Sequence, residues 1–167
     1  MRGATIFWIV VAIGVMVVAG TLDVLPPTVA THFDAAGRAN EWSSRRGYAI
    51  VLAVIGVGLP LLIVGVVGVF ARRAPQWINL PHREIWLAEL HRAEGIARAR
   101  EHIWWLACVL AMTALGTHFA LLGANTQQPP RLPLAAALGL IAFPLGCLVM
   151  WAVTWHRLFR PPPGSPP

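Results

Sequence analysis

Two histidines and a nearby carboxylate are the side chains with the clearest capacity for chemistry in this 167-residue sequence. His32 and Asp34 lie two residues apart in a polar stretch, whereas His118 lies in an apolar block. Two imidazoles and a carboxylate suit zinc or another transition metal, and histidine also changes charge near neutral pH. Because His-x-Asp is far less specific than His-Glu-x-x-His on a helix, a metal site and a proton-sensitive or peptide-contacting surface are both open hypotheses.

The sequence gives no indication of an enzyme built on an activated nucleophile. It contains no G-x-S-x-G motif, Walker A motif or dinucleotide-binding fingerprint. Ser43 and Ser44 lie beside arginines with no base nearby. Cys108 and Cys147 lack CxxC spacing and are expected to be small core residues, with a bridge between them left open. We therefore expect no cofactor and, outside the metal hypothesis, no catalysis.

The composition indicates that these residues belong to a membrane protein. The chain is 57% hydrophobic and 12% charged, with a mean hydropathy of +0.64, which is outside the usual balance of a soluble domain. Four apolar blocks occupy about residues 4–25, 48–70, 103–122 and 134–155. Each is long enough, at about 1.5 Å per residue, to cross a hydrocarbon core of about 30 Å. We predict an all-α, four-helix transmembrane bundle that forms one domain over residues 1–160.

The segment between the first two blocks, residues 26–47, is expected to be an exposed outer loop. Within it, Val29, Thr31 and Phe33 alternate with other residues, which indicates an extended stretch. The run from Asp34 to Gly37 offers a turn.

The remaining polar segments are expected on the other side of the membrane. We predict that residues 74–102 form a cytoplasmic helical loop. Asn79 is expected to cap a helix, because Pro81 and Glu84 suit a first helical turn. This helix is expected to run straight into the third block. The proline-rich residues 161–167 are expected to be a disordered tail. A cleavable signal peptide is the alternative for the first block, whose apolar run nevertheless outlasts a normal signal-peptide core.

The arginines predict the orientation. All 13 basic residues are arginine, and the formal net charge is +6. With the N-terminus inside, nine arginines fall in cytoplasmic segments and four in outer loops, namely Arg38, Arg45, Arg46 and Arg131. The positive-inside rule therefore predicts that both termini of this multi-pass protein are cytoplasmic. The complete absence of lysine, together with much Ala, Gly, Arg and Pro, indicates a high-GC bacterial genome, so we expect the protein in a bacterial inner membrane. Because the arginines do not line one soluble face, we expect no nucleic-acid partner.

Small residues predict which helix faces pack together, since close approach drives helix association in lipid. Three stripes are candidates: Ala135, Gly139, Ala142 and Gly146; Gly58, Gly65 and Gly68; and Ala107, Ala111 and Ala114. The third stripe continues to His118, which is therefore predicted inside the bundle near its outer end. This histidine is expected either to be satisfied by Thr117, a carbonyl or water, or to join the outer His and Asp residues in a site.

The first polar segment resembles a known family. Leu25 to Gly37 followed by Trp42 resembles the LP-x-x-V-x-x-H-F-x-x-x-G pattern of an uncharacterised bacterial membrane domain, and Ile78 to Trp86 resembles its second signature. That domain also forms the N-terminal part of SdpI-type toxin-immunity proteins. The resemblance implies an immunity-like or accessory role and marks His32, Gly37 and Trp42 as signature positions.

Together these patterns predict a non-enzymatic membrane protein that binds or senses a peptide, a lipid or a partner protein through its outer loop. The expected binding residues are His32, Phe33, Asp34, Gly37, Trp42 and His118. The expected partners are membrane lipids and a peptide or membrane-protein partner, with a homo-oligomer of the chain as a further hypothesis. The alternatives are a metal-binding protein or enzyme that uses His32, Asp34 and His118, and an oligomeric transporter component.

Overall fold

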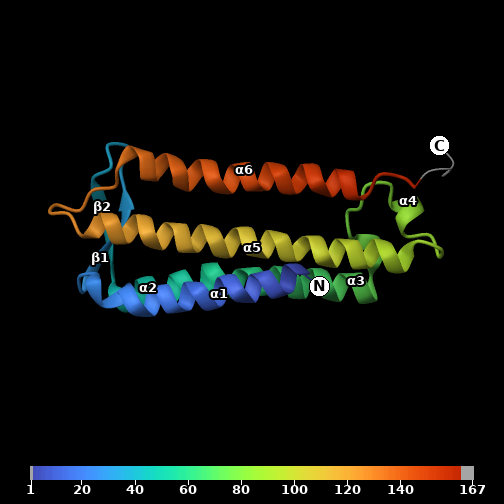
Figure 1. Cartoon of the computed structure of the whole chain (residues 1–167), viewed down its shortest axis with the longest axis horizontal. Helices are drawn as coiled ribbons and strands as arrows, with labels where there is room; N and C mark the ends of the chain where they lie inside the picture. The colour runs from blue at the N-terminus through green and yellow to red at the C-terminus, as the bar shows by residue number, and fades with distance from the viewer. Residues whose placement is uncertain (1, 163–167) are drawn as a thin grey trace.

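A β-hairpin caps one end of an elongated helical bundle (Figure 1). The computed structural model describes residues 2–162. Its elements are α1 (Arg2–Thr21), η1 (Leu22–Val24), β1 (Thr28–Phe33), β2 (Ala39–Ser44), α2 (Arg45–Ala53), η2 (Val54–Gly58), α3 (Leu59–Arg73), η3 (Pro75–Trp77), α4 (Arg83–Trp86), α5 (Arg92–Asn125) and α6 (Leu134–Leu158). The start of α1 and the end of α6 lie away from the hairpin. Of the predicted tail, residues 163–167 lie outside the described part.

Four helices are long and apolar enough to cross a membrane, as the apolar blocks predicted. They are Arg2–Val24, Arg45–Arg73, Arg92–Asn125 and Leu134–Leu158. The second is α2, η2 and α3 in one continuous helix, in which η2 is a π-helical turn. Pro60 follows this turn and has no N–H to donate to the carbonyl of Gly56, so the regular hydrogen-bond ladder is interrupted where the helix widens.

The prediction of an all-α fold is wrong for residues 26–47. Instead of a loop, this segment contains the antiparallel pair β1 and β2, in which Thr28 lies opposite Ser44 and Phe33 lies opposite Ala39. The expected extended stretch is confirmed as β1. The segment forms strands because β-branched and aromatic residues favour a pleated, half-buried surface and the intervening turn residues close the hairpin.

The predicted start of a helix at Asn79 is also wrong. His82 adopts a left-handed conformation with φ 52°, α4 is only a short helix, and the long helix begins at Arg92. The indole of Trp86 donates a hydrogen bond of 2.9 Å to the carbonyl of Phe159, just beyond α6. The segment folds back across the ends of α5 and α6 because Trp86 is buried there with Leu80 and Phe159.

The other helices assemble around α5. Figure 1 shows α6 on one side of α5, and α1 and α3 on the other. Ala107, Ala111 and Ala114 are buried, which confirms the predicted stripe on this helix. An ideal Cβ on Gly56 of η2 would lie 3.0 Å from the Cβ of Ala114, so the two helices meet closely there. Both cysteines are free; Cys108 is buried and Cys147 is half-buried.

In the other two stripes every residue is exposed except Gly68, which lies beside the side chain of Arg72 on its own helix. Ala135, Gly139, Ala142 and Gly146 are all exposed, and α6 contains no fully buried residue. A Cβ added to Gly58 or Gly65 would meet nothing within 4 Å. The face of α6 that meets α5 instead carries Trp151. Its indole N–H donates a 3.0 Å hydrogen bond to the carbonyl of His102, and its own carbonyl lies 2.9 Å from Nε2 of the same histidine. An aromatic and hydrogen-bonded contact therefore replaces the predicted small-residue contact.

We predict that the two glycines of η2 respond differently to the same substitution. Gly56→Leu should lower the free energy of unfolding by roughly 1–3 kcal/mol, because the new side chain overpacks the contact with Ala114. Gly58→Leu, two residues away in open space, should change it by less than about 0.5 kcal/mol. Unfolding of the detergent-solubilised variants by denaturant titration measures both. Equal losses would contradict the packing of this turn on α5.

Candidate functional site at the hairpin end

The hairpin turn is built by two of the predicted site residues. Asp34 Oδ1 accepts hydrogen bonds from the backbone N–H groups of Ala36 at 2.9 Å and Arg38 at 2.8 Å. The bond from the Arg38 backbone contributes most to holding the pKa of Asp34 below its usual value. Gly37 has a φ of 74°, and an ideal Cβ there would clash with the carbonyl oxygen of Leu132. Asp34 and Gly37 therefore shape the turn and seat it on the loop between α5 and α6.

Asn125, at the last turn of α5, attaches β1 to the bundle. Its Oδ1 accepts a 2.8 Å hydrogen bond from the backbone N–H of Ala30, and its Nδ2 donates to the carbonyls of Ala30 at 3.0 Å and Leu121 at 2.9 Å. The buried amide thus pairs with Ala30 as a neighbouring strand would. Sequence analysis missed this residue, although a lone amide at the end of an apolar helix is itself a signal, because buried polar groups need partners.

His118 joins three helices just below the hairpin. Its side chain is fully buried. Nδ1 lies 2.8 Å from the hydroxyl of Tyr48 on α2, and Nε2 lies 2.8 Å from the hydroxyl of Thr21 at the end of α1. The prediction that His118 lies inside the bundle is confirmed, and its partners are the two hydroxyls rather than Thr117.

The three hydrogen bonds around His118 determine which imidazole nitrogen carries the proton. Thr21 Oγ1 lies 2.7 Å from the carbonyl of Val17, to which it donates its single proton. It must therefore accept from His118, which places the imidazole proton on Nε2. Nδ1 is then an acceptor, and Tyr48 donates to it. Every polar group of the network is satisfied with a neutral imidazole, which describes a structural link between helices.

The structure does not bring His32, Asp34 and His118 together. His32 lies on β1 with an exposed side chain, and its Nδ1 is 3.4 Å from a carboxylate oxygen of Glu41 on the neighbouring strand. Asp34 is engaged in the turn, and His118 is enclosed by its own partners. Across residues 2–162, no group of three or more His, Cys, Asp or Glu side chains is arranged to hold a metal ion.

Trp42 and Phe33 project from the hairpin into different surroundings. Phe33 packs on the buried cluster of Leu25, Val29, Tyr48 and Leu121. Trp42 is 54% exposed, which is high for so large an apolar side chain. It lines an open cleft of about 570 Å³ between β2 and the loop that joins α5 to α6. The other residues that line this cleft are Arg38, Ala39, Gln127, Gln128, Pro129, Pro130 and Arg131. Of the predicted binding residues, Trp42 and His32 are the exposed ones.

We predict that His118 and Tyr48 are energetically coupled. His118→Leu leaves the Tyr48 hydroxyl buried without its acceptor and should cost roughly 1–3 kcal/mol of unfolding free energy. Adding Tyr48→Phe removes the orphaned hydroxyl, so the double variant should be no less stable than His118→Leu alone. Denaturant titration in mild detergent gives the coupling energy between the two positions. Phe119→Leu, at an exposed neighbouring position, is the control. Strictly additive losses would contradict the network.

Comparison with known proteins places the chain in a family. Residues 9–57, from α1 through the hairpin to η2, match the family model described as "Domain of unknown function (DUF1648)". An uncharacterised protein of Archaeoglobus fulgidus is 30% identical over 131 residues, which cover 75% of this chain and 72% of that protein. No solved structure is significantly similar, and neither match connects the chain with toxin immunity. The chain belongs to the same family as this archaeal protein and carries the domain of unknown function in its N-terminal half.

Proposed function

We propose that this protein is a non-enzymatic, four-span protein of a bacterial inner membrane that binds an extended polypeptide at its hairpin. The hairpin faces the cell exterior, and both termini are cytoplasmic. The uneven distribution of arginine supports this orientation, because four arginines belong to the hairpin-side segments and nine to the opposite segments.

An unpaired strand edge supports polypeptide binding. The sheet has two strands, and β1 is covered on its far side where Asn125 binds Ala30. Among the described residues, the far side of β2 has one bridge, between Arg38 and Arg131, just before the strand begins. Within residues 2–162, no strand pairs with this edge from Ala39 to Ser44. Unpaired N–H and C=O groups along such an edge can pair with an extended chain.

The exposed indole of Trp42 is the single observation that carries the proposal. Tryptophan is enriched among residues that dominate binding energy, because it buries a large area and loses little conformational entropy. Trp42 lies on β2, the strand whose outer edge is unpaired, beside a cleft that can accept a side chain of the bound polypeptide. Under the resemblance to toxin-immunity proteins, that polypeptide would be a secreted peptide and the role one of immunity or an accessory function.

Reporter fusions test the orientation. A periplasmic reporter such as alkaline phosphatase, inserted next to Asn40, should be active, and the same reporter fused after Arg160 should be inactive. A cytoplasmic reporter should give the opposite pattern at both positions. Cytoplasmic activity next to Asn40 would overturn the proposed orientation.

Photo-crosslinking in intact cells tests the binding surface. A photoreactive residue in place of Asn40 on β2 should form adducts with a polypeptide. Trp42→Ala should reduce their yield at least about tenfold, the effect of losing a residue that contributes more than about 1.4 kcal/mol to binding. Trp77→Ala is the matched control, because Trp77 is 76% exposed but lies at the opposite end of the protein. Equal adduct yields in both variants would show that the hairpin edge is not the binding surface.

A further inference from the structure

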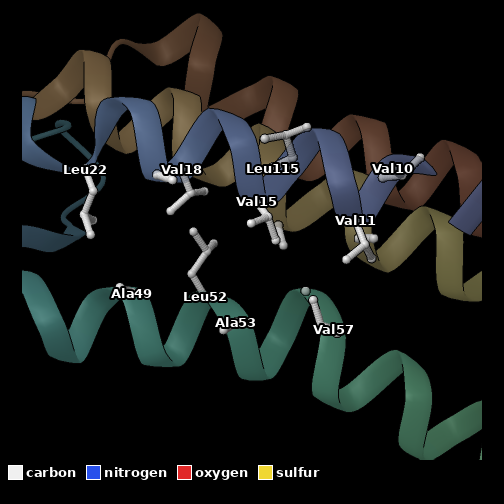
Figure 2. A pocket seen from close by; sticks show the side chains of 15 residues that line it. Val10, Val11, Val15, Val18, Leu22, Ala49, Leu52, Ala53, Val57 and Leu115 are labelled. Carbon is white, nitrogen blue, oxygen red and sulfur yellow. The ribbon is translucent and has the colours of Figure 1, made fainter. Parts of the chain in front are cut away.

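An apolar crevice separates α1 from the helix formed by α2 and η2 (Figure 2). Its volume is about 310 Å³. One wall runs from Val10 of α1 to Leu22 at the start of η1, and the other runs from Ala49 to Val57. Ala111, Ala114 and Leu115 of α5 form the floor. It exists because α1 and the second helix both pack on α5 and make few contacts with each other.

The length of the crevice corresponds to one leaflet of a bilayer. At about 1.5 Å per helical residue, its walls extend roughly 18 Å along α1 and roughly 12 Å along α2 and η2. Half of a hydrocarbon core measures about 15 Å. The residues that line it are valine, leucine, alanine and glycine. A hydrocarbon chain is therefore the chemistry that the crevice accepts, since no side chain along it offers a hydrogen bond.

A charged pair closes the hairpin end of the crevice. Asp23 directly follows Leu22 of the first wall, and Arg45 lies one helical turn before Ala49 of the second. Arg45 Nη1 donates a 2.7 Å hydrogen bond to Asp23 Oδ1, so the pair connects the two walls. The Nε–H of Arg45 is buried without a hydrogen-bond partner. The guanidinium thus has donor capacity that the described residues leave unused.

The charge at this end of the crevice favours an anion. Arg45 and Arg46 begin α2, where the helix dipole is already positive, and the first turn contains no acidic residue. Asp23 is the only carboxylate bonded to Arg45 among the described residues, and its side chain is 96% exposed. A phosphate group can therefore approach Arg45 from the side on which Asp23 lies.

We propose that the crevice binds one acyl chain of an anionic glycerophospholipid whose phosphate is held by Arg45. The acyl chain lies between α1 and α2 in the leaflet on the hairpin side, and the phosphate competes with Asp23 for the guanidinium. This inference requires that the helices cross a membrane. It does not depend on polypeptide binding at β2.

Native mass spectrometry of the full chain tests the proposal. The protein is purified in mild detergent and mixed with equal amounts of phosphatidylglycerol and phosphatidylcholine that carry the same acyl chains. Both lipids carry the phosphate, but the quaternary ammonium group of phosphatidylcholine would lie beside Arg45 and Arg46 and oppose its binding. One phosphatidylglycerol molecule should therefore be retained per protein, in at least tenfold preference. Equal retention of the two lipids, or of neither, would overturn the proposal.

Matched variants locate the chain and the phosphate. Gly14→Leu fills the crevice and should reduce lipid retention at least tenfold, whereas Gly20→Leu, an exposed position on the same helix that does not line it, should not. Ala53→Leu blocks the crevice from the opposite wall and serves if Gly14→Leu fails to fold. Arg45→Gln should abolish the preference for the anionic lipid, with Arg46→Gln as the matched control.

The variant Asp23→Asn gives a prediction of opposite sign. It removes the carboxylate that competes for Arg45, so it should raise retention of phosphatidylglycerol severalfold. Lower or unchanged retention would refute the role of Arg45 as the phosphate ligand. The cross-links at Asn40 should be the same in all these variants, so a failure of the lipid proposal is distinguishable from a failure of the proposed function.

Discussion

Close approach to a single helix, α5, is the constraint on which the rest of the structure depends. Helices in lipid gain little from bringing apolar side chains together, so they associate where backbones can approach closely or where polar groups can pair. α5 provides both conditions. Its alanines Ala107, Ala111 and Ala114 admit the neighbouring helices, and its histidines His102 and His118 bond to different helices at separate levels. The crevice is a direct result, because two helices that share one support need not touch each other.

Polar contacts, together with the burial of Val29 against Tyr48 and Leu121, fix the hairpin relative to the helices. Asn125 pairs with the backbone of Ala30, and Gly37 allows Leu132 to approach the turn. Each contact is specific in direction, so together they define the position of both strands. The exposed side chain of Trp42 is consequently presented on a well-defined platform, which reduces the entropic cost of binding a partner.

The parts of the fold that could be predicted are those set by local composition. The four spans follow from hydropathy because a helix that crosses lipid must be apolar along its whole length, and β1 follows from the alternation around Thr31. The choice between small-residue faces could not be predicted, since Ala111 and Gly139 lie in equally suitable stripes and only the partner helices decide which is used. The pairing of Asn125 with Ala30 and the fold-back at Trp86 could not be predicted either, because both depend on contacts between residues far apart in sequence. Nor could the geometric role of Gly37 be predicted, because a signature position marks a constraint without stating whether the constraint is geometric or chemical.

The position of α5 as the third of the four long apolar helices has a consequence for biosynthesis. The first two spans emerge from the ribosome with few contacts to make with each other, and their shared support is not complete until Asn125 has been made. Until then, the hydroxyls of Thr21 and Tyr48 lack the imidazole that links them, and β1 lacks the amide that holds it. The assembly of the N-terminal half is therefore complete only once α5 has been made. A ribosome that stalls before this point would leave an unassembled pair of helices for the membrane quality-control proteases.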